Sequence, residues 1–380
     1  MLVTGARAPV ALDWLRRLKA GGHAVWLADS VWWCGTAGSR HHQGYLRVPP
    51  ARQAPRAFLD ALAQACVTHA IDWILPTCEE VFWVAQGADD LPARVFVDRI
   101  EGLENLHHKG RFAELTHALG HAIQAPPTQE VGSRQEAEGL GNPQDWVFKP
   151  AYSRFASRTQ VGPEASVLRT IDWGSESWVA QRRIRGVEHS TFGLAHEGRL
   201  VAHGCYRSVY RVGTGSGVLF RNVTEAQPLI REFVERLVAH GRFTGQIGFD
   251  FLTDASGTYV IECNPRATSG LHLFAPGQLM EPLFDPQGPL VLASGEDRSL
   301  GFAMPMVAEA ARPWLWRRWW RDWSATRDVV WDAHDVGPFV RTPLSVVEFV
   351  WRGLRTGRSP TGASTFDIEW DGTRIINVDG

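Results

Sequence analysis

Residues 248–266 read GFDFLTDASGTYVIECNPR, and the acidic residues of this stretch stand between apolar neighbours. Apolar runs on either side of the polar segment TDASGT predict two strands joined by a turn. Such a hairpin would place Asp250 beside Glu262 and Asn264, and the last two share one face because they are two positions apart. Two carboxylates and an amide oxygen suit Mg²⁺, which takes further ligands from water and substrate phosphates. Arg266 continues this face and would supply a permanent cation for a phosphoryl or acyl-phosphate oxygen.

A surface hairpin with ordinary acidic residues is the alternative, and Asp250 taken alone favours it. The E-x-N-P-R string at 262–266 disfavours it, because it joins an apolar strand to a carboxylate, an amide and a guanidinium without a helical period. At these residues the chain resembles the ATP-grasp superfamily, in its carbamoyl-phosphate-synthase-like branch of carboxylate–amine ligases. The resemblance implies that Asp250, Glu262 and Asn264 hold the magnesium of Mg-ATP and that Arg266 stabilises an acyl phosphate.

Lysine is rare in this chain, which indicates specific roles for the few that are present. It occurs only at Lys19, Lys109 and Lys149, and the other 36 of the 39 basic residues are arginine. A lysine is expected to remain where a compact ammonium on a flexible stem is required. Lys149 lies in the apolar strand predicted at 146–150, where an unpaired charge is costly, so a phosphate partner is favoured. A surface strand whose lysine faces water is the alternative.

Two segments around these lysines resemble ATP-grasp motifs that contact ATP. Residues 105–112 resemble the D-K-x-x-F segment, with His108 in place of the Asp, and residues 146–150 resemble the V-x-K-P strand. The resemblance implies that Lys109 reaches the ATP phosphates and that Lys149 contacts the α-phosphate and the adenine side.

Residues 151–160 follow as the expected loop over the phosphates, although the chain has no glycine there before Gly162. Hydroxyl, guanidinium and backbone N–H groups can cradle phosphate in place of a glycine-rich loop. Ser153 and Ser157 are therefore the predicted hydroxyl contacts of this loop.

Residues 178–190 resemble the hinge of the ATP-grasp fold, written roughly E-x-x-I-x-G-x-E. The matching positions are Gln181, Arg182, Ile184 and Glu188, and Gln181 replaces the usual acid while keeping hydrogen-bonding groups. The resemblance implies that backbone groups of the hinge bind the adenine edge and that Glu188 binds the ribose or the adenine amine. An edge strand followed by a turn is the alternative.

The first 95 residues predict a small doubly wound domain. Strand and helix patterns alternate in it, at residues 1–6, 10–18, 23–29, 57–66 and 71–76. Thr77, Glu79 and Glu80 would then follow a parallel strand, at the end where open sheets bind ligands. A helix cap with first-turn acids is the favoured alternative for these three residues.

We therefore expect a chain of α/β and α+β architecture, in which a small doubly wound parallel-sheet domain precedes an ATP-grasp fold and a C-terminal extension follows it. The expected boundaries are 1–95, 96–290 with a hinge near 181–188, and 291–380. The extension carries a Trp/Arg-rich segment at 313–323. Trp and Arg together suit a membrane interface, but a helix that packs its Trp on the body with Arg outward is preferred. Residues 367–374 predict a small terminal hairpin.

Composition limits the partners that the chain is expected to have. Lys and Arg number 39 against 41 Asp and Glu, a net charge of −2, which gives no broad electrostatic case for nucleic acid. No apolar run approaches a membrane span and no signal peptide is evident. Five scattered cysteines without a C-x-x-C pair predict neither a disulfide framework nor a zinc site, so we expect a cytoplasmic protein.

The resemblance implies an ADP-forming ligase that uses ATP and Mg²⁺, with Mn²⁺ as a substitute, to join a small-molecule carboxylate to an amine. A homodimer is common among such relatives. The alternatives are a carboxyphosphate-forming or thiol-ligating enzyme of the same superfamily and a non-catalytic nucleotide-binding protein.

Overall fold

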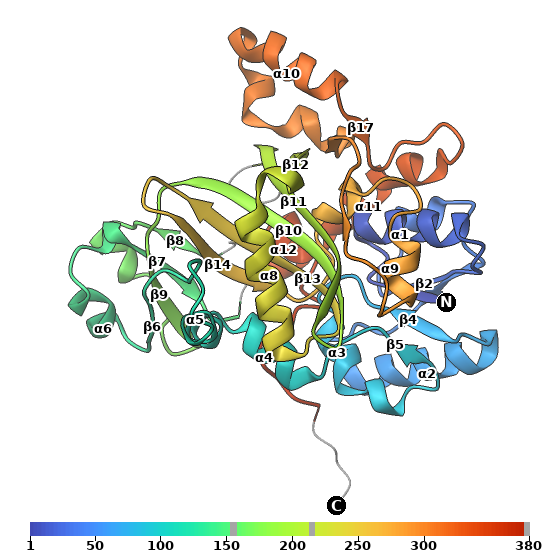
Figure 1. The fold of residues 1–380 in the computed structure, drawn as a ribbon, viewed down its shortest axis with the longest axis horizontal. Helices are drawn as coiled ribbons and strands as arrows, with labels where there is room; N and C mark the ends of the chain where they lie inside the picture. Colours follow the sequence, from blue (N-terminus) through green and yellow to red (C-terminus); the bar gives the residue numbers. More distant parts are fainter. Residues whose placement is uncertain (153–157, 213–216, 376–380) are drawn as a thin grey trace, which may run out of the picture.

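The computed structural model describes residues 1–152, 158–212 and 217–375, and three β-sheets organise this part of the chain (Figure 1). The first sheet is parallel and has the order β3-β2-β1-β4-β5. Its strands are β1 (Leu2–Thr4), β2 (Trp26–Asp29), β3 (Gly44–Arg47), β4 (Trp73–Leu75) and β5 (Arg94–Val95). The strand order reverses between β1 and β4, so the carboxyl ends of these two strands border the crevice of a doubly wound sheet. The predicted doubly wound domain is therefore confirmed in its topology.

Helices pack against this parallel sheet because each buries its apolar face there. They are α1 (Pro9–Ala20), α2 (Pro55–His69) and α3 (Val81–Gln86). Helix α4 (Ile100–His107) follows and packs against α3 and the strand Thr258–Asn264. Proline at the first turn starts both α1 and α2, where its missing N–H has no cost. Apolar residues at helical spacing in α1, such as Leu12, Leu15 and Leu18, are fully or almost fully buried.

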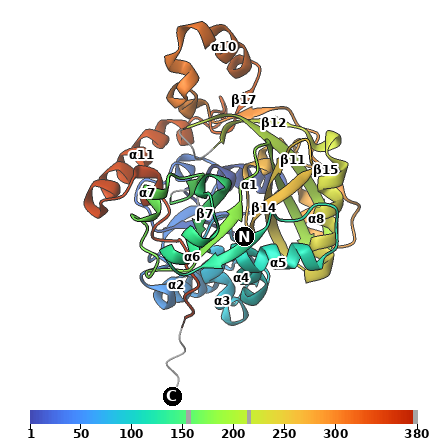
Figure 2. The same cartoon turned by 90° about the vertical axis from the view of Figure 1, so that its left-hand side faces the viewer.

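A small antiparallel sheet follows α5 (Lys109–Ala118) and has the order β6-β9-β7-β8. Its strands are β6 (Thr128–Val131), β7 (Trp146–Pro150), β8 (Gln160–Val161) and β9 (Trp178–Arg182). Two short helices, α6 (Arg134–Gly139) and α7 (Ala165–Leu168), close one side of it (Figures 1 and 2). Phe148 and Trp178 centre a separate apolar core, so this unit has few buried contacts with the rest of the chain.

The largest sheet is mostly antiparallel and has the order β14-β13-β10-β11-β12-β16-β17, with β15 paired to β11. Its strands are β10 (Val187–His196), β11 (Arg199–Arg211), β12 (Gly217–Asn222), β13 (Gly245–Thr253), β14 (Thr258–Asn264), β15 (Val291–Leu292), β16 (Arg298–Ser299) and β17 (Arg327–Asp328). Helix α8 (Pro228–Gly241) packs across it, and Phe233 of α8 meets Phe249 and Phe251 of β13 edge to face. This aromatic contact fixes the face of β13 that is turned away from Asp250.

The parallel sheet and the large sheet share their apolar cores, so the site between them has rigid walls. One core joins residues of α2, α3 and α4 to residues of α8, β13 and β14. Buried hydrogen bonds cross the seam: Trp14 donates to Gln246 (2.7 Å), and Gln246 donates to the carbonyl of Pro76 (2.6 Å).

The C-terminal part leaves the large sheet and returns to the parallel one. Its helices are α9 (Met280–Phe284), α10 (Trp316–Ser324), α11 (Gly337–Thr356) and α12 (Pro360–Ala363). The expected terminal hairpin at 367–374 is wrong: no described residue after β17 forms a strand, and this segment consists of turns held by side-chain contacts. Over residues 1–152, 158–212 and 217–375, no helix has both the length and the apolar character needed to cross a bilayer.

Candidate active site

The hairpin predicted at 248–266 is formed by β13 and β14, and its register brings the three oxygen-bearing residues together. Asp250 lies directly opposite Glu262, and Asn264 pairs with Gly248 at the next position on the same face. The register shifts immediately after Asp250, which marks a β-bulge beside the acidic pair. The prediction of the hairpin, and of a shared face for its polar side chains, is confirmed.

Asp250 is held by two donors but remains an unfavourable place for a charge. Ser190 donates to one carboxylate oxygen (2.5 Å) and the amide of Asn264 donates to the other (3.0 Å). Burial, together with the facing carboxylate of Glu262, raises the pKa of Asp250 to about 8. Two acids forced together in this way favour the arrival of a cation between them.

Two buried lysines neutralise the other member of the acidic pair. Burial alone would raise the pKa of Glu262, but Lys109 and Lys149 reverse this effect and lower it. Lys149 donates to the side chain of Gln181 (3.0 Å) and to the carbonyl of Ile261 (3.1 Å), and burial lowers its pKa to about 8. Lys149 is therefore not on a water-facing strand, and it adjoins the acidic hairpin as the rarity of lysine suggested.

Lys109 reaches the same cluster from the first turn of α5. Its ammonium donates to the carbonyl of Ala151 (3.5 Å), and burial lowers its pKa although Glu262 and Glu79 act to raise it. His108, which stands where the motif has an Asp, caps α5 by accepting the backbone N–H of Arg111 (3.3 Å). The replacement keeps the capping function that Asp would provide at this position.

Arg266 bridges the hairpin and the parallel sheet. It donates to Glu79 (2.9 Å) and to the side-chain oxygen of Asn264 (2.9 Å). The side chain of His107 lies 4.0 Å from Glu79, and burial lowers the pKa of this histidine to about 4, so it is neutral near pH 7. Sequence reasoning placed Glu79 at the end of a parallel strand but did not predict its ion pair with Arg266.

The neighbouring acid, Glu80, has a structural part in this arrangement. Its carboxylate accepts hydrogen bonds from Thr4 (2.8 Å) and from the backbone N–H of Thr77 (3.0 Å), and burial raises its pKa. Gly5 is required beside it, because a Cβ at that position would lie 2.6 Å from the carboxylate. Glu80 therefore ties the carboxyl ends of β1 and β4 together, and Glu79 is the member of the pair that faces the acidic hairpin.

The predicted hinge residues divide between the cleft and the outer surface. Gln181 is buried, accepts from Lys149 and donates to Thr128 (3.0 Å). Arg182 alternates to the outer face, where it pairs with Asp145 (3.4 Å), so only its backbone faces inward. Ile184 is half-buried, and Glu188 on β10 accepts from Arg211. Ser153 and Ser157 of the expected phosphate loop lie outside the described residues.

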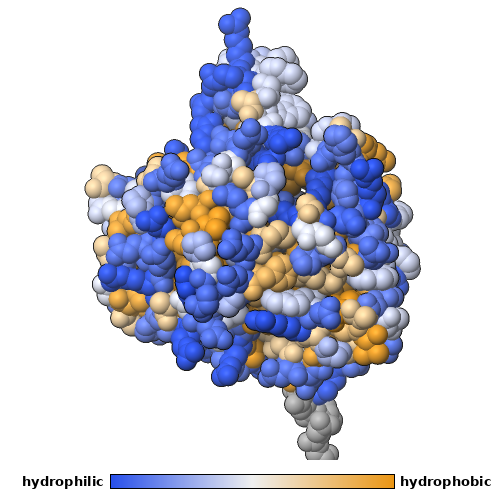
Figure 3. All heavy atoms as spheres, turned by 45° about the vertical axis from the view of Figure 1, so that its right-hand side comes forward, coloured by the Kyte–Doolittle hydropathy of each residue, from blue (hydrophilic) through white to orange (hydrophobic). Residues whose placement is uncertain are grey.

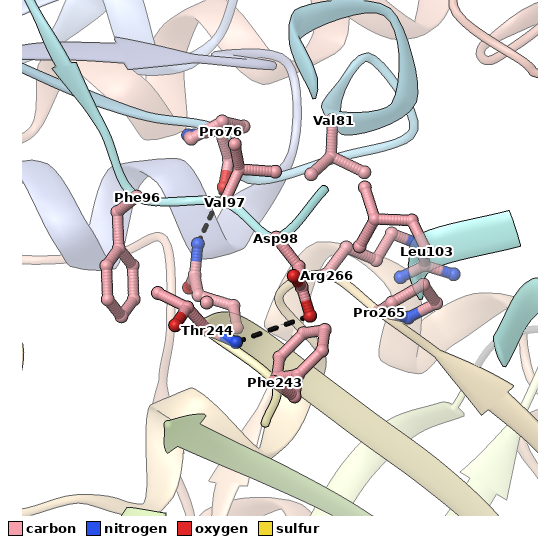
Figure 4. Close-up of a pocket in the computed structure, with 12 residues that line it drawn as sticks. Pro76, Val81, Phe96, Val97, Asp98, Leu103, Phe243, Thr244, Pro265 and Arg266 are labelled. Carbon is pink, nitrogen blue, oxygen red and sulfur yellow. Dashed lines mark hydrogen bonds between the residues drawn. The ribbon is translucent and has the colours of Figure 1, made fainter. Parts of the chain in front are cut away.

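A narrow gap without room for a water molecule lies at the seam between the parallel and the large sheet (Figure 4). Pro76 and Asp98 line one side, Thr244 lines the other, and Arg266 borders it. Asp98 accepts the backbone N–H of Thr244 (3.4 Å), and most of the remaining lining residues are apolar. The pocket is a packing gap behind Arg266, separate from the charged cluster in front of it.

Sequence comparison places the hairpin, Lys149 and the hinge within one known domain. A family model described as an ATP-grasp domain matches residues 113–270. The matched segment has the ATP-grasp fold. Lys109 lies four residues before the matched segment and the C-terminal part lies outside it. A sequence search of curated proteins found no match.

Solved structures similar to this chain have the same fold. The biotin carboxylase domain of 2-oxoglutarate carboxylase from Hydrogenobacter thermophilus has a TM-score of 0.59 at 13% identity, covering 72% of this chain and 65% of that chain. An L-amino acid ligase from Bacillus licheniformis gives 0.54 at 17%, covering 71% and 67%. An N5-carboxyaminoimidazole ribonucleotide synthetase from Thermus thermophilus gives 0.57 at 13%, covering 78% and 81%.

At such identities the likeness establishes the ATP-grasp fold alone. The chain spans 65% of the length of the first of these proteins. The predicted fold class, an ATP-grasp fold with a parallel doubly wound sheet before it, is confirmed.

The C-terminal segment 364–375 also borders the ATP-grasp site, and no sequence pattern predicted this. Trp370 stacks on Phe82 (4.9 Å between ring centroids) and meets Tyr152, in the expected phosphate loop, edge to face (5.3 Å). Glu369 acts on Lys109 by raising its pKa against the effect of burial, which brings a third carboxylate to this lysine. The only local signal was the acid-rich run D-I-E-W-D at 367–371, and this run does not predict which residues it contacts.

Proposed function

We propose that this protein is an ATP-dependent, ADP-forming ligase that joins a carboxylate to an amine. The observation that carries the proposal is the convergence of Asp250, Glu262 and Asn264 with two buried lysines and Arg266 in one cluster. A solvated surface hairpin would leave Asp250 exposed to water and would give no reason to bury Lys109 and Lys149 beside it.

The donor set of the hairpin fits a hard divalent cation. Within the described ranges no group of three or more His, Cys, Asp or Glu is arranged to hold a metal, so the site would use two carboxylates, water and phosphate. The amide oxygen of Asn264, which accepts from Arg266 in this structure, would join them on rotation of the amide toward Asp250. This is the type of site that Mg²⁺ prefers, because it keeps several waters and takes substrate phosphate oxygens. The raised pKa of Asp250 agrees with it, since a cation would relieve the repulsion from Glu262.

The chain's own residues would bind and orient the reacting groups. Lys109 and Lys149 would bind phosphate oxygens of the nucleotide, and the backbone around Gln181 and Arg182, with Glu188, would hold the adenosine end. Arg266, fixed by Glu79 and Asn264, would stabilise charge on the activated carboxyl group. Bound Mg-ATP would supply the phosphoryl group that converts the carboxylate into an acyl phosphate, with ADP as the leaving group. An amine would then attack the acyl carbon, and inorganic phosphate would leave. Positioning and charge neutralisation provide most of the rate in such transfers.

The similar structures support the ATP-dependent part of the proposal more than its substrate. The carboxylase domain from Hydrogenobacter thermophilus was solved with MgADP and bicarbonate, and the Bacillus licheniformis protein is named an L-amino acid ligase. They therefore leave two candidate first substrates, an organic carboxylate and bicarbonate. We propose the organic carboxylate, because the E-x-N-P-R hairpin resembles that of the carboxylate–amine ligases.

A test is to measure ADP release with Mg-ATP and a matrix of carboxylates and amines, with bicarbonate as a separate carboxylate. The proposal predicts ADP release that requires both an organic carboxylate and an amine, and hydroxylamine should trap the activated carboxyl as a hydroxamate. Release with bicarbonate alone would favour carboxyphosphate formation, and release that needs a thiol would favour thiol ligation. Binding of ATP without turnover under any pairing would favour a non-catalytic nucleotide-binding protein.

A further inference from the structure

Helices α10 and α11 leave a large part of their aromatic and apolar side chains uncovered. Figure 2 shows α10 projecting from the top of the molecule and α11 lying along its outer edge. Both belong to the part of the chain that the ATP-grasp match does not include. The exposed side chains number more than a scattering of single apolar residues would explain, and such a concentration marks an interaction surface.

Helix α10 uses only half of its tryptophans for packing. Trp319 and Trp323 lie against the apolar cluster around Met304, where the indole of Trp319 donates to the Met304 carbonyl (3.3 Å). Trp320 is 61% exposed, and Trp314, just before the helix, is 77% exposed. The expectation that the tryptophans of this segment pack on the body is therefore only half right.

Helix α11 carries an apolar stripe on its outer side. Five of its exposed apolar residues follow a 4-3-4-3 spacing, which keeps them on one face of the helix: Val340, Leu344, Val347, Trp351 and Leu354. Val340 is 64% exposed and Leu354 is 81% exposed. Trp331, between the two helices, meets Phe339 in the first turn of α11 edge to face (5.1 Å). Both are exposed, so the apolar surface extends from α11 toward α10.

Around this apolar surface exposed arginines outnumber the acids, which include the half-exposed Asp332 beside Trp331. The only acid of α11 is Glu348, which is turned inward, where it accepts from the backbone N–H groups of Trp32 and Trp33 (3.1 and 2.7 Å). The only acid of α10 is Asp322, which accepts from the hydroxyl of Tyr210 (2.9 Å) and pairs with Arg318 (3.7 Å) and Arg321 (3.1 Å), so one acid stands against the three arginines of this helix. Outward cations of the two helices include Arg317, Arg318, Arg321 and Arg355. In Figure 3 the projecting top is blue and near-white, so the side chains exposed on it are hydrophilic or of intermediate hydropathy.

We propose that the outer faces of α10 and α11 dock on an anionic phospholipid surface. Tryptophan side chains place an apolar ring and a polar N–H at the level of lipid headgroups, and aliphatic residues of an amphipathic helix enter the boundary of the acyl chains. Arginines beside them attract acidic headgroups. Since neither helix can cross a bilayer, the protein would lie on the membrane with α10 and α11 toward it.

The charge pattern favours a lipid surface over a second copy of the chain. A twofold contact through α11 would bring the same stripe of each copy together, and arginines would then face arginines without acids to pair with them. An anionic bilayer has the opposite charge and no fixed shape to match. A cation–π contact places Arg355 over the ring of Trp351 (3.8 Å), which holds apolar and cationic groups side by side at the exposed surface.

The test is co-sedimentation of the full-length protein with vesicles of phosphatidylcholine alone and with about 30% phosphatidylglycerol. We expect binding to the anionic vesicles, weakening at least about tenfold when salt rises from about 0.05 M to about 0.5 M. The variant Leu344→Ser/Leu354→Ser and the variant Arg317→Glu/Arg321→Glu should each reduce vesicle binding about tenfold or more. Matched controls on other helices are Val67→Ser, an exposed apolar residue of α2, and Arg169→Glu, which follows α7; both should bind as the unaltered protein does.

Absence of binding to anionic vesicles at low salt, or equal binding by the helix variants and the controls, would overturn the proposal. A concentration-dependent dimer that the Leu344→Ser/Leu354→Ser variant dissociates, without vesicle binding, would assign the surface to a second copy instead. The measurement uses no nucleotide or substrate, so its outcome is independent of the proposed ligase activity.

Discussion

The hairpin β13–β14 and the C-terminal segment 364–375 both bury carboxylates next to basic side chains, but the pKa shifts of these carboxylates have opposite directions. In the hairpin, burial and the facing Glu262 raise the pKa of Asp250 to about 8. In the C-terminal segment burial would raise the pKa of Asp367, but Arg7 and Arg352 lower it to about 2. Among the described residues no lysine or arginine forms an ion pair with Asp250, whereas Asp367 pairs with both Arg7 and Arg352.

This difference separates a region suited to ligands from a region that holds the fold. Arg7 joins Asp29 (2.5 Å) to Asp367 (2.5 Å), and Ser30 donates to the same Asp367 (2.6 Å), so the segment closes the crevice at the carboxyl ends of β1 and β2 with satisfied ion pairs. Trp83 adds a hydrogen bond to the carbonyl of Ile368 (3.0 Å). A site that binds a charged nucleotide must keep unbalanced charge, whereas a structural joint is most stable when its charges are balanced.

The largest expected effect comes from a substitution beside the hairpin β13–β14. Lys149→Met should lower ADP formation by about 100-fold or more, since it removes a buried cation aimed at phosphate oxygens. Lys19→Met is the control, because Lys19 is exposed near the end of α1 and should leave the rate unchanged. Steady-state rates with Mg-ATP measure this, and equal rates for the two variants would remove Lys149 from the site.

In the C-terminal segment 364–375, the expected effect of a substitution is on stability. Asp367→Ala should lower the free energy of unfolding by about 3 kcal/mol at pH 7, because it leaves Arg7 and Arg352 buried with fewer partners. The folded pKa of Asp367 lies below its unfolded value, so this contribution is present at neutral pH and is lost as pH falls through about 2. Asp371→Asn, a half-exposed partner of Arg52, should cost less than about 1 kcal/mol. Urea unfolding measures both, and similar losses would mean that the two sites are equally important for stability.

Asp250→Asn should raise the free energy of unfolding at pH 7, whereas Asp367→Ala should lower it. Because the folded pKa of Asp250 lies above its unfolded value, the folded state holds more protons between about pH 4 and pH 8, and the free energy of unfolding falls as pH rises across this window. The variant should remove that slope and raise stability at pH 7 by about 1 kcal/mol in metal-free buffer. A steeper slope in the variant, measured by urea unfolding at several pH values, would show that Asp250 is stabilised by its surroundings.

The smallest effect concerns nucleotide affinity. The pKa of Lys149, which burial lowers to about 8, means that the free protein loses this charge at mildly alkaline pH. Affinity for ADP should therefore fall about fourfold between about pH 7 and about pH 8.5, with proton uptake on binding at the higher pH. Calorimetry in buffers of different ionisation enthalpy measures the uptake. An affinity independent of pH would place Lys149 away from the phosphates.

The sequence predicts the hairpin and its lysines because their signals are local. Alternating apolar positions set the two strands, the E-x-N-P-R string marks one end, and the scarcity of lysine singles out Lys109 and Lys149. The contact of Arg266 with Glu79 joins residues 187 positions apart, so it depends on how two sheets meet and has no local pattern.

The contacts of the C-terminal segment are even less predictable from local sequence patterns. Asp367 contacts residues more than 300 positions away, and its charge balance comes from Arg7, for which the sequence offers no indication. An acid-rich run beside Gly372 predicts a turn or hairpin by its composition, but tertiary contacts determine its conformation. In the hinge, the side chain of Arg182 points outward because strand alternation places it opposite to Gln181.

One measurement tests the central assignment directly: Mg²⁺-dependent ADP release by Glu262→Ala beside Asp254→Asn, with folding followed by circular dichroism. Asp254 lies in the exposed turn of the same hairpin, where an asparagine oxygen can still accept from Ser256 and Gly257. We expect Glu262→Ala to fold and to lose ADP formation, while Asp254→Asn keeps the full rate. Undiminished turnover in a folded Glu262→Ala protein would mean that the acidic hairpin does not hold the metal.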